Sequence, residues 1–177
     1  MNSIRKSIAT ALMIALCVVL PMAFHAIPNG GTLFSPMHLP VLIAGIIAGP
    51  LYGLFCGIAG PVLSFLITGM PGAAYLPVMM IELGIYGLVT GLMMRLVKTG
   101  KTIADLYISL VAAMLSGRII TGICRALIFA KGKYSVAAWA AGYFVSCWPA
   151  IVIQLILIPM LYLALEKAGL AERRYKN

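Results

Sequence analysis

Residues 115–125 read Leu-Ser-Gly-Arg-Ile-Ile-Thr-Gly-Ile-Cys-Arg, which places Arg118 and Arg125 in an otherwise apolar stretch. Their separation is about two turns of an α-helix, so both side chains lie on one face of that helix. A charged side chain near the centre of a bilayer costs about 2.5–3.5 kcal/mol on insertion scales. Arg125 is close enough to the expected helix end to reach the interface, whereas Arg118 needs a counter-charge, water or a ligand. The stretch therefore predicts a membrane helix in which Arg118 lines a functional cavity.

The composition of the whole chain is that of an integral membrane protein. Of its 177 residues, 63% are hydrophobic and 10% are charged, whereas soluble domains carry about 25% charged residues. The net charge of +9 does not indicate nucleic-acid binding, because the basic residues flank the apolar runs and form no basic face. The four cysteines lie in apolar segments without paired spacing, which favours small packing residues over disulfides or metal ligands.

The apolar runs predict an all-α integral membrane protein, a six-transmembrane-helix bundle forming one domain over residues 1–177. Several runs reach the length of about 17–25 residues that spans a bilayer as a helix, and they lack the alternation of barrel strands. The expected spans are residues 7–27, 38–49, 50–69, 75–97, 103–129 and 141–165. We expect the first span to be retained rather than cleaved as a signal peptide, because no A-x-A site follows it and more spans come after.

The distribution of basic residues predicts the orientation of such a bundle. Most of them fall on one side: Arg5, Lys6, Arg95, Lys98, Lys101, Lys167, Arg173, Arg174 and Lys176. The other side holds only Lys131 and Lys133. The positive-inside rule then places both termini in the cytoplasm.

Small residues recur at intervals of four in two places and predict close helix contacts there. One ladder crosses the junction of the second and third spans: Gly45, Gly49, Gly53 and Gly57. For this ladder we expect very close helix packing. The other lies on one face of the first span: Ser7, Ala11 and Ala15. This second face serves either ordinary packing inside the bundle or docking onto a different subunit.

Ionisable side chains gather in the outer half of the predicted bundle. Glu82 lies about two turns below the outer end of the fourth span, Arg118 lies near mid-depth in the fifth, and His38 begins the second at the outer level. This asymmetry indicates a cavity open to the outside and not a channel or a proton wire.

Two interpretations of these charges remain open. Glu82 and Arg118 lie on neighbouring antiparallel helices and can form a structural ion pair. Alternatively, Glu82, Arg118 and Arg125 jointly hold a polar solute, and the surplus positive charge favours a carboxylate that a guanidinium binds bidentately. Weaker candidates for the same site are Asn29, His38, Tyr75, Trp148 and Gln154.

Familiar catalytic and nucleotide-binding motifs are absent from the sequence. It contains no G-x-x-x-x-G-K-[ST], no H-E-x-x-H and no G-x-S-x-G. We therefore predict a protein that is not an enzyme and holds no metal or cofactor of its own. An active transporter of this size would need an energy source supplied by another protein.

Four segments carry a resemblance to a known family: Ala11-Leu-Met-Ile-Ala15, residues 37–45 (Met-His-Leu-Pro-Val-Leu-Ile-Ala-Gly), residues 82–87 (Glu-Leu-Gly-Ile-Tyr-Gly) and Leu115-Ser-Gly-Arg-Ile119. Together with six short spans and a Gly/Pro-rich first outer loop, they make the chain resemble the substrate-binding S component of energy-coupling factor (ECF) vitamin transporters. The resemblance covers nearly the whole chain.

This resemblance implies a function and a set of partners. A vitamin or precursor would bind in the outer half of the bundle under the loops 28–37 and 69–74. Ala11 and Ala15 would dock on a separate transmembrane coupling (T) component, which carries two ATPases. ATP would be used by those partners, and the S component would topple in a bacterial plasma membrane to release its cargo inside.

The substrate and two further classes of function stay open at this point. The paired arginines favour pantothenate or another small carboxylate, whereas Glu82 also suits an aminopyrimidine thiamine precursor, and a queuosine precursor is a third option. One alternative class is a free-standing secondary transporter with Glu82 as proton carrier, which proton-gradient-dependent uptake without an ATPase would identify. The other is an intramembrane enzyme or a structural assembly protein, against which the missing catalytic motif argues.

Overall fold

The computed structural model describes residues 2–24, 27, 30–129 and 135–175, and over these residues it is built of helices and turns alone. Five helices are long and apolar enough to cross a membrane: α1 (Ser3–Ala23), α4 (Pro50–Thr68), α5 (Leu76–Leu96), α6 (Thr102–Cys124) and α8 (Trp148–Lys167). Three helices are shorter: α2 (Gly30–Phe34), α3 (His38–Ala48) and α7 (Val136–Ala140). Two π-helical turns, η1 (Arg125–Phe129) and η2 (Ala141–Val145), continue α6 and α7 respectively.

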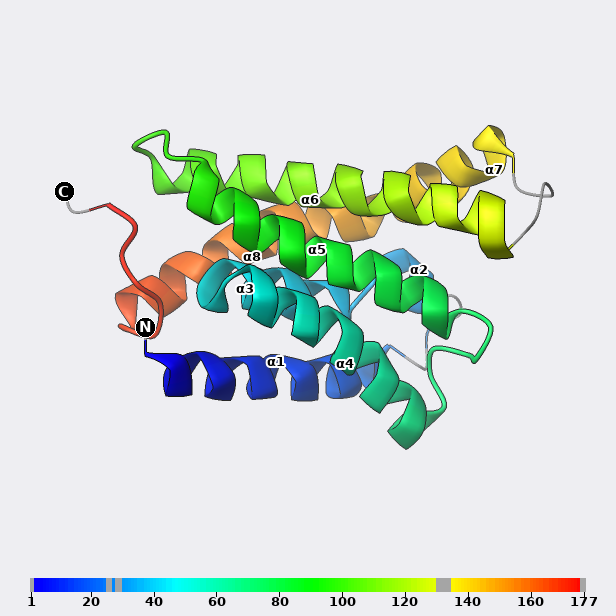
Figure 1. The fold of residues 1–177 in the computed structure, drawn as a ribbon, viewed down its shortest axis with the longest axis horizontal. Coiled ribbons are helices and arrows are strands. Elements are labelled where there is room, and N and C mark those ends of the chain that lie inside the picture. The colour runs from blue at the N-terminus through cyan, green and yellow to red at the C-terminus, as the bar shows by residue number, and fades with distance from the viewer. Residues whose placement is uncertain (1, 25–26, 28–29, 130–134, 176–177) are drawn as a thin grey trace.

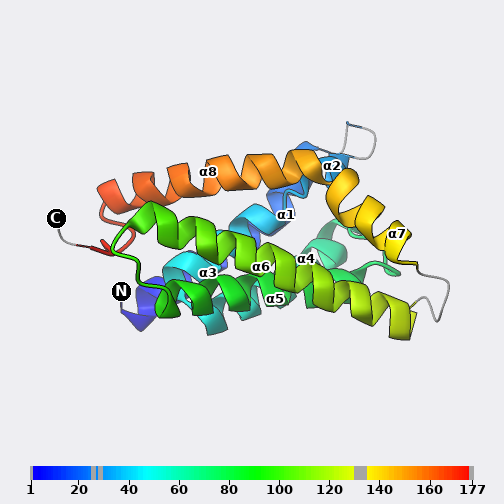
Figure 2. The ribbon, with the colours of Figure 1, turned by 90° about the horizontal axis from the view of Figure 1, so that it is seen from above.

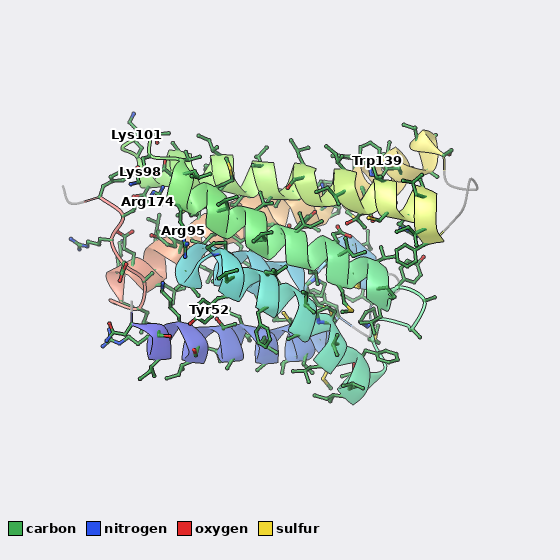
Figure 3. The ribbon with its side chains drawn as sticks, in the orientation of Figure 1. Tyr52, Arg95, Lys98, Lys101, Trp139 and Arg174 are labelled. Carbon is green, nitrogen blue, oxygen red and sulfur yellow. The ribbon has the colours of Figure 1, made fainter. Side chains whose placement is uncertain are left out.

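The long helices run side by side, with α1 and α6 at opposite edges of the bundle in Figure 1. Figure 2 shows α8 along one side and α5 along the other. Both chain ends lie at one end of the bundle, here called the terminal end, and α2 and α7 lie at the opposite end, here called the loop end (Figures 1 and 2). Figure 3 places Arg95, Lys98, Lys101 and Arg174 at the terminal end and Trp139 at the loop end.

The second predicted span is a helix of half the usual length. Helix α3 has 11 residues, or about 16 Å at 1.5 Å per residue, whereas the hydrocarbon core of a bilayer is about 30 Å thick. It begins at the buried His38 in the interior, and the turn into α4 follows at Gly49, whose φ of 103° suits glycine. The bundle over the described residues therefore contains five full-length helices and two shorter apolar helical segments, His38–Ala48 and Val136–Val145.

The predicted start of the sixth span, residue 141, is wrong. The chain expected as a loop up to Ala140 contains α7, and η2 extends it before α8 begins at Trp148. Helix α7 forms because Ser135 caps it, its Oγ accepting a hydrogen bond from the Ala138 N–H at 3.1 Å. This helical segment folds back over the loop end and becomes part of the site described below.

The predicted glycine ladder is confirmed as a very close contact of α3 and α4 with α5. A Cβ atom added to Gly45 would lie 2.5 Å from the carbonyl oxygen of Gly87, and one added to Gly91 would lie 2.5 Å from the nitrogen of Pro50. Gly53 and Gly87 face each other backbone to backbone. Such contacts supply the van der Waals packing that holds helices together in lipid, where burial of apolar surface contributes little.

The small-residue face of α1 lies on the outside of the bundle. Ser7, Ala11 and Ala15 are exposed, and so are the neighbouring Ile8 and Leu12, at 64% and 58%. The opposite face packs inward through Thr10, Met13, Ile14, Cys17 and Val18. Ser7 interacts with the Tyr52 side chain of α4, whereas Ala11 and Ala15 leave an exposed small-residue surface on α1.

Candidate functional site

The loop end contains a cavity of about 840 Å³, within the range of about 300–1,000 Å³ typical of small-molecule sites. Its walls come from the end of α1, from residues 30–38, from the turn at 70–75, from α5 and α6, and from the segment 138–147. The lining is mostly apolar, and among the described residues it includes the acidic and basic side chains His38, Glu82, Arg118 and Arg125.

Most of the site residues expected from the sequence meet at this cavity. His38, Tyr75, Glu82, Arg118 and Arg125 line it. The three other candidates are placed differently. Trp148 is 62% exposed and does not line the cavity, because the turn at residues 146–147 presents Ser146 and Cys147 to it instead. Gln154 is fully buried in α8 away from the lining, and Asn29 lies outside the described residues.

Glu82 pairs with a histidine, and no ion pair with Arg118 is found in the described part of the chain. The Nε2 of His38 lies 3.5 Å from the Oε1 of Glu82, and both residues are 8% exposed. The imidazole also packs edge-on against the ring of Tyr86, with centroids 5.1 Å apart. The prediction that His38 lies at the outer level is wrong: because α3 begins in the interior, His38 reaches the depth of Glu82.

Arg118 is held in place by aromatic side chains of the α7–η2 segment. Its Cζ lies 5.3 Å from the ring centroid of Phe144, a cation–π arrangement. The Trp139 Nε1 donates a hydrogen bond to the carbonyl oxygen of Arg118 at 3.0 Å, and its ring packs edge-on against Phe144. Gly122 leaves room for this indole, since a Cβ there would lie 2.5 Å from the Trp139 ring. These contacts fasten the segment across α6.

The guanidinium of Arg118 retains capacity for a ligand. The residue is 4% exposed, and its Nε finds no hydrogen-bond partner among the described residues. A buried donor without a partner costs about 1–3 kcal/mol, so an acceptor that reaches it from the cavity is favoured. Arg125 lies further toward the mouth of the cavity, with its Cζ 5.5 Å from the ring centroid of the half-exposed Tyr75.

Sequence reasoning missed the aromatic residues that shape the site. Tyr86, Trp139 and Phe144 contact His38 or Arg118, yet none of them was among the candidate site residues, and Trp139 lies in the stretch before residue 141 that was expected to be a loop. The available signal was a pair of glycines on either side of Arg118. Gly117 leaves room for the Tyr86 ring just as Gly122 does for the indole.

The arrangement suits non-covalent binding of a small polar solute. It offers a carboxylate acceptor with its histidine, two guanidinium donors and a largely apolar wall. Among the described residues, no group of three or more His, Cys, Asp or Glu side chains is arranged to hold a metal ion.

Comparison with known proteins gives one result. The model of the family "ECF transporter, substrate-specific component" matches residues 5–162, which include the whole cavity wall. No curated protein matches the chain, and no solved structure matches it either. The family is one of transporters and not of enzymes. A match over nearly the full length, on a membrane bundle with a ligand-sized cavity, establishes that the chain belongs to the substrate-specific components of ECF transporters.

Proposed function

We propose that this chain captures a vitamin or cofactor precursor bearing a carboxylate, with pantothenate the leading candidate, and delivers it for ATP-driven uptake. The observation that carries the proposal is Arg118, a buried guanidinium that lines the 840 Å³ cavity and keeps an Nε donor without a partner in the described residues. A carboxylate accepts two parallel hydrogen bonds from a guanidinium, so it satisfies this donor and neutralises the charge together.

The charge balance of the cavity also favours an anion. Arg118 and Arg125 contribute two positive charges, and Glu82 contributes one negative charge that His38 faces at 3.5 Å. The net charge of the lining is therefore positive whether or not the histidine is protonated. Glu82 and His38 are left to bind hydroxyl, amide or amino groups of the neutral part of the ligand.

Two other substrates would contact the same residues, but their binding would depend on Glu82 and Arg118 to different extents. An aminopyrimidine thiamine precursor would depend on Glu82 as hydrogen-bond acceptor more than on Arg118. A queuosine precursor, with both donor and acceptor edges, would depend on both residues.

The proposed orientation places the terminal end in the cytoplasm. Arg95, Lys98, Lys101 and Arg174 gather there in Figure 3, and an excess of basic residues is typical of cytoplasmic ends. The cavity at the loop end would then face the outside of a bacterial cell. Docking onto the T component would use the exposed small-residue face of α1, with two ATPases of the complex supplying the energy.

The test begins with the chain purified in mild detergent and any co-purified small molecule identified by mass spectrometry. Isothermal titration with that compound should then show Arg118→Ala binding about tenfold or more weaker, because a hydrogen bond to a charged group contributes about 1.5–3 kcal/mol. Arg95→Ala, an exposed arginine at the opposite end, is the matched control and should bind normally. Unchanged affinity in Arg118→Ala refutes the carboxylate assignment, and a loss confined to Glu82→Gln identifies the aminopyrimidine instead.

The buried Glu82–His38 pair favours a second candidate, a free-standing proton-coupled transporter. In that case proteoliposomes containing this chain alone would accumulate substrate in response to a pH gradient. Uptake that needs the T component, the ATPases and ATP rules this candidate out.

A further inference from the structure

A second cavity, of about 720 Å³, lies at the terminal end and shares no lining residue with the first. It is formed by the start of α6, the last turns of α8 and the tail that follows α8. Its charged lining residues are Lys101, Glu166, Lys167 and Arg173, so the lining carries a net charge of +2. In the part of the chain that the structure describes, none of the three cations has an ion-pair partner within 4 Å.

The walls of this cavity are fixed by hydrogen bonds to one buried carboxylate. Asp105, on α6, is fully buried. Its Oδ1 accepts hydrogen bonds from the N–H and hydroxyl of Thr99 at 2.9 and 2.7 Å, and its Oδ2 accepts one from the Tyr175 hydroxyl at 2.6 Å. Arg174 forms an ion pair with the same Oδ2 and donates to the carbonyl of Met94 at 2.5 Å. The tail is thereby attached to the turn between α5 and α6.

This attachment determines where Arg173 lies. On one side of it Arg174 is bound to Asp105, and on the other the Tyr162 hydroxyl donates to the carbonyl of Glu172 at 3.1 Å. A residue held between two such anchors has little freedom to leave the rim of the cavity. Asp105 already has Arg174 as its counter-charge, so it does not neutralise the three free cations.

The remaining wall points to a phosphate group at the membrane surface. The first turn of α6 lines the cavity and has no side-chain cap on its N–H groups, and a helix N-terminus of this kind favours anions. The apolar Ile103 and Leu163 complete the lining. Because the candidate spans α6 and α8 begin and end here, respectively, the cavity would lie at the level of the lipid headgroups when these helices cross a bilayer. We propose that it binds the phosphate of an anionic phospholipid, with Lys101, Lys167 and Arg173 as its ligands.

The test measures lipid retained on the full chain in neutral detergent by native mass spectrometry during titration with phosphatidylglycerol or zwitterionic phosphatidylcholine. The wild type should prefer phosphatidylglycerol. Replacing Lys101, Lys167 and Arg173 by glutamine should weaken that binding about tenfold or more, since each basic residue near an anionic surface contributes roughly fivefold. A charge-conserving triple, Lys101→Arg, Lys167→Arg and Arg173→Lys, should retain it and shows that the loss follows charge.

A second triple provides the matched control. Arg5→Gln, Lys6→Gln and Lys98→Gln remove the same charge from residues that do not line the cavity, and this variant should keep wild-type lipid affinity. Equal losses in the two triples, or no preference for phosphatidylglycerol, would overturn the proposal. Displacement of the lipid by millimolar inorganic phosphate would assign the cavity to a soluble anion and also overturn it. Binding at the first cavity should be normal in every variant, so this test is independent of the proposed cargo.

Discussion

Replacing Gly87 by alanine should force α5 away from α4. The added methyl group would collide with the backbone Cα, C and O atoms of Gly53, which no side-chain rotation can move aside. Overpacking of this kind costs about 1–3 kcal/mol, and alanine recovers about 1 kcal/mol through its higher helix propensity. Since the methyl group would collide with backbone atoms, the upper part of that range applies, and the net loss in the free energy of unfolding is about 2 kcal/mol. For a chain of this size that corresponds to a fall in Tm of about 4–8 °C.

Gly84→Ala provides the matched control on the same helix. Its methyl group would meet the Cδ1 of Leu54 at 3.2 Å, which is the far end of a flexible side chain. Accommodation is therefore cheap, and the gain in helix propensity should leave the Tm unchanged or slightly raised.

The assay follows thermal unfolding in detergent with a thiol-reactive fluorophore. Cys17 and Cys56 are fully buried and react only when the bundle opens, whereas the half-buried Cys124 and Cys147 contribute a baseline. If Gly87→Ala melts at or above the temperature of Gly84→Ala, the backbone contact between α4 and α5 does not limit stability and the reasoning fails.

Three further substitutions test other parts of the structure. Phe144→Leu should weaken cargo binding roughly five- to thirty-fold, because it removes the cation–π contact with Arg118, which contributes about 1–2 kcal/mol. Titration should show that Phe144→Tyr, which keeps an aromatic ring, binds the cargo with wild-type affinity. Equal affinity of the two variants would contradict the positioning role of Phe144. Asp105→Asn should destabilise the protein by about 3 kcal/mol, because it removes the buried carboxylate that is the counter-charge of the half-buried Arg174, and a thermal melt matching the wild type would argue against this. Tryptophan at both Ala11 and Ala15 should abolish uptake by the assembled transporter while cargo binding to the isolated chain is retained, and normal uptake would remove the docking face.

The features that the sequence predicted well are those that depend on one helix or on neighbouring helices. An interval of four residues within α4 places Gly53 and Gly57 on a shared face whatever the tertiary structure, so close packing followed directly. Glu82 and Arg118 lie at matched depths on consecutive antiparallel helices, which is enough to bring them to one cavity.

The features that it did not predict depend on how distant segments fold together. The contact of His38 with Glu82 exists because α3 is of half length, and nothing local in residues 38–48 shows where in the bilayer that helix begins. Trp148 was a candidate site residue and Trp139 was not, yet Trp139 contacts Arg118 and Trp148 does not line the cavity. The π-helical turn η2 and the turn at residues 146–147 lie between these two residues and together set which one faces the site.

Because α3 is of half length, the packed frame of the bundle and much of the cavity wall are formed by different segments of the chain. The glycine-packed core of α3, α4 and α5 sets the rigid frame, and the exposed face of α1 is independent of the cavity. Much of the cavity wall comes instead from residues 30–38, 70–75 and 138–147, whose lengths are not tied to the thickness of a bilayer. Insertions or exchanges there would reshape the chamber for a different cargo without disturbing the frame or its docking surface. The same fold can in this way bind different cargoes, since function resides in a site carried by the fold and not in the fold itself.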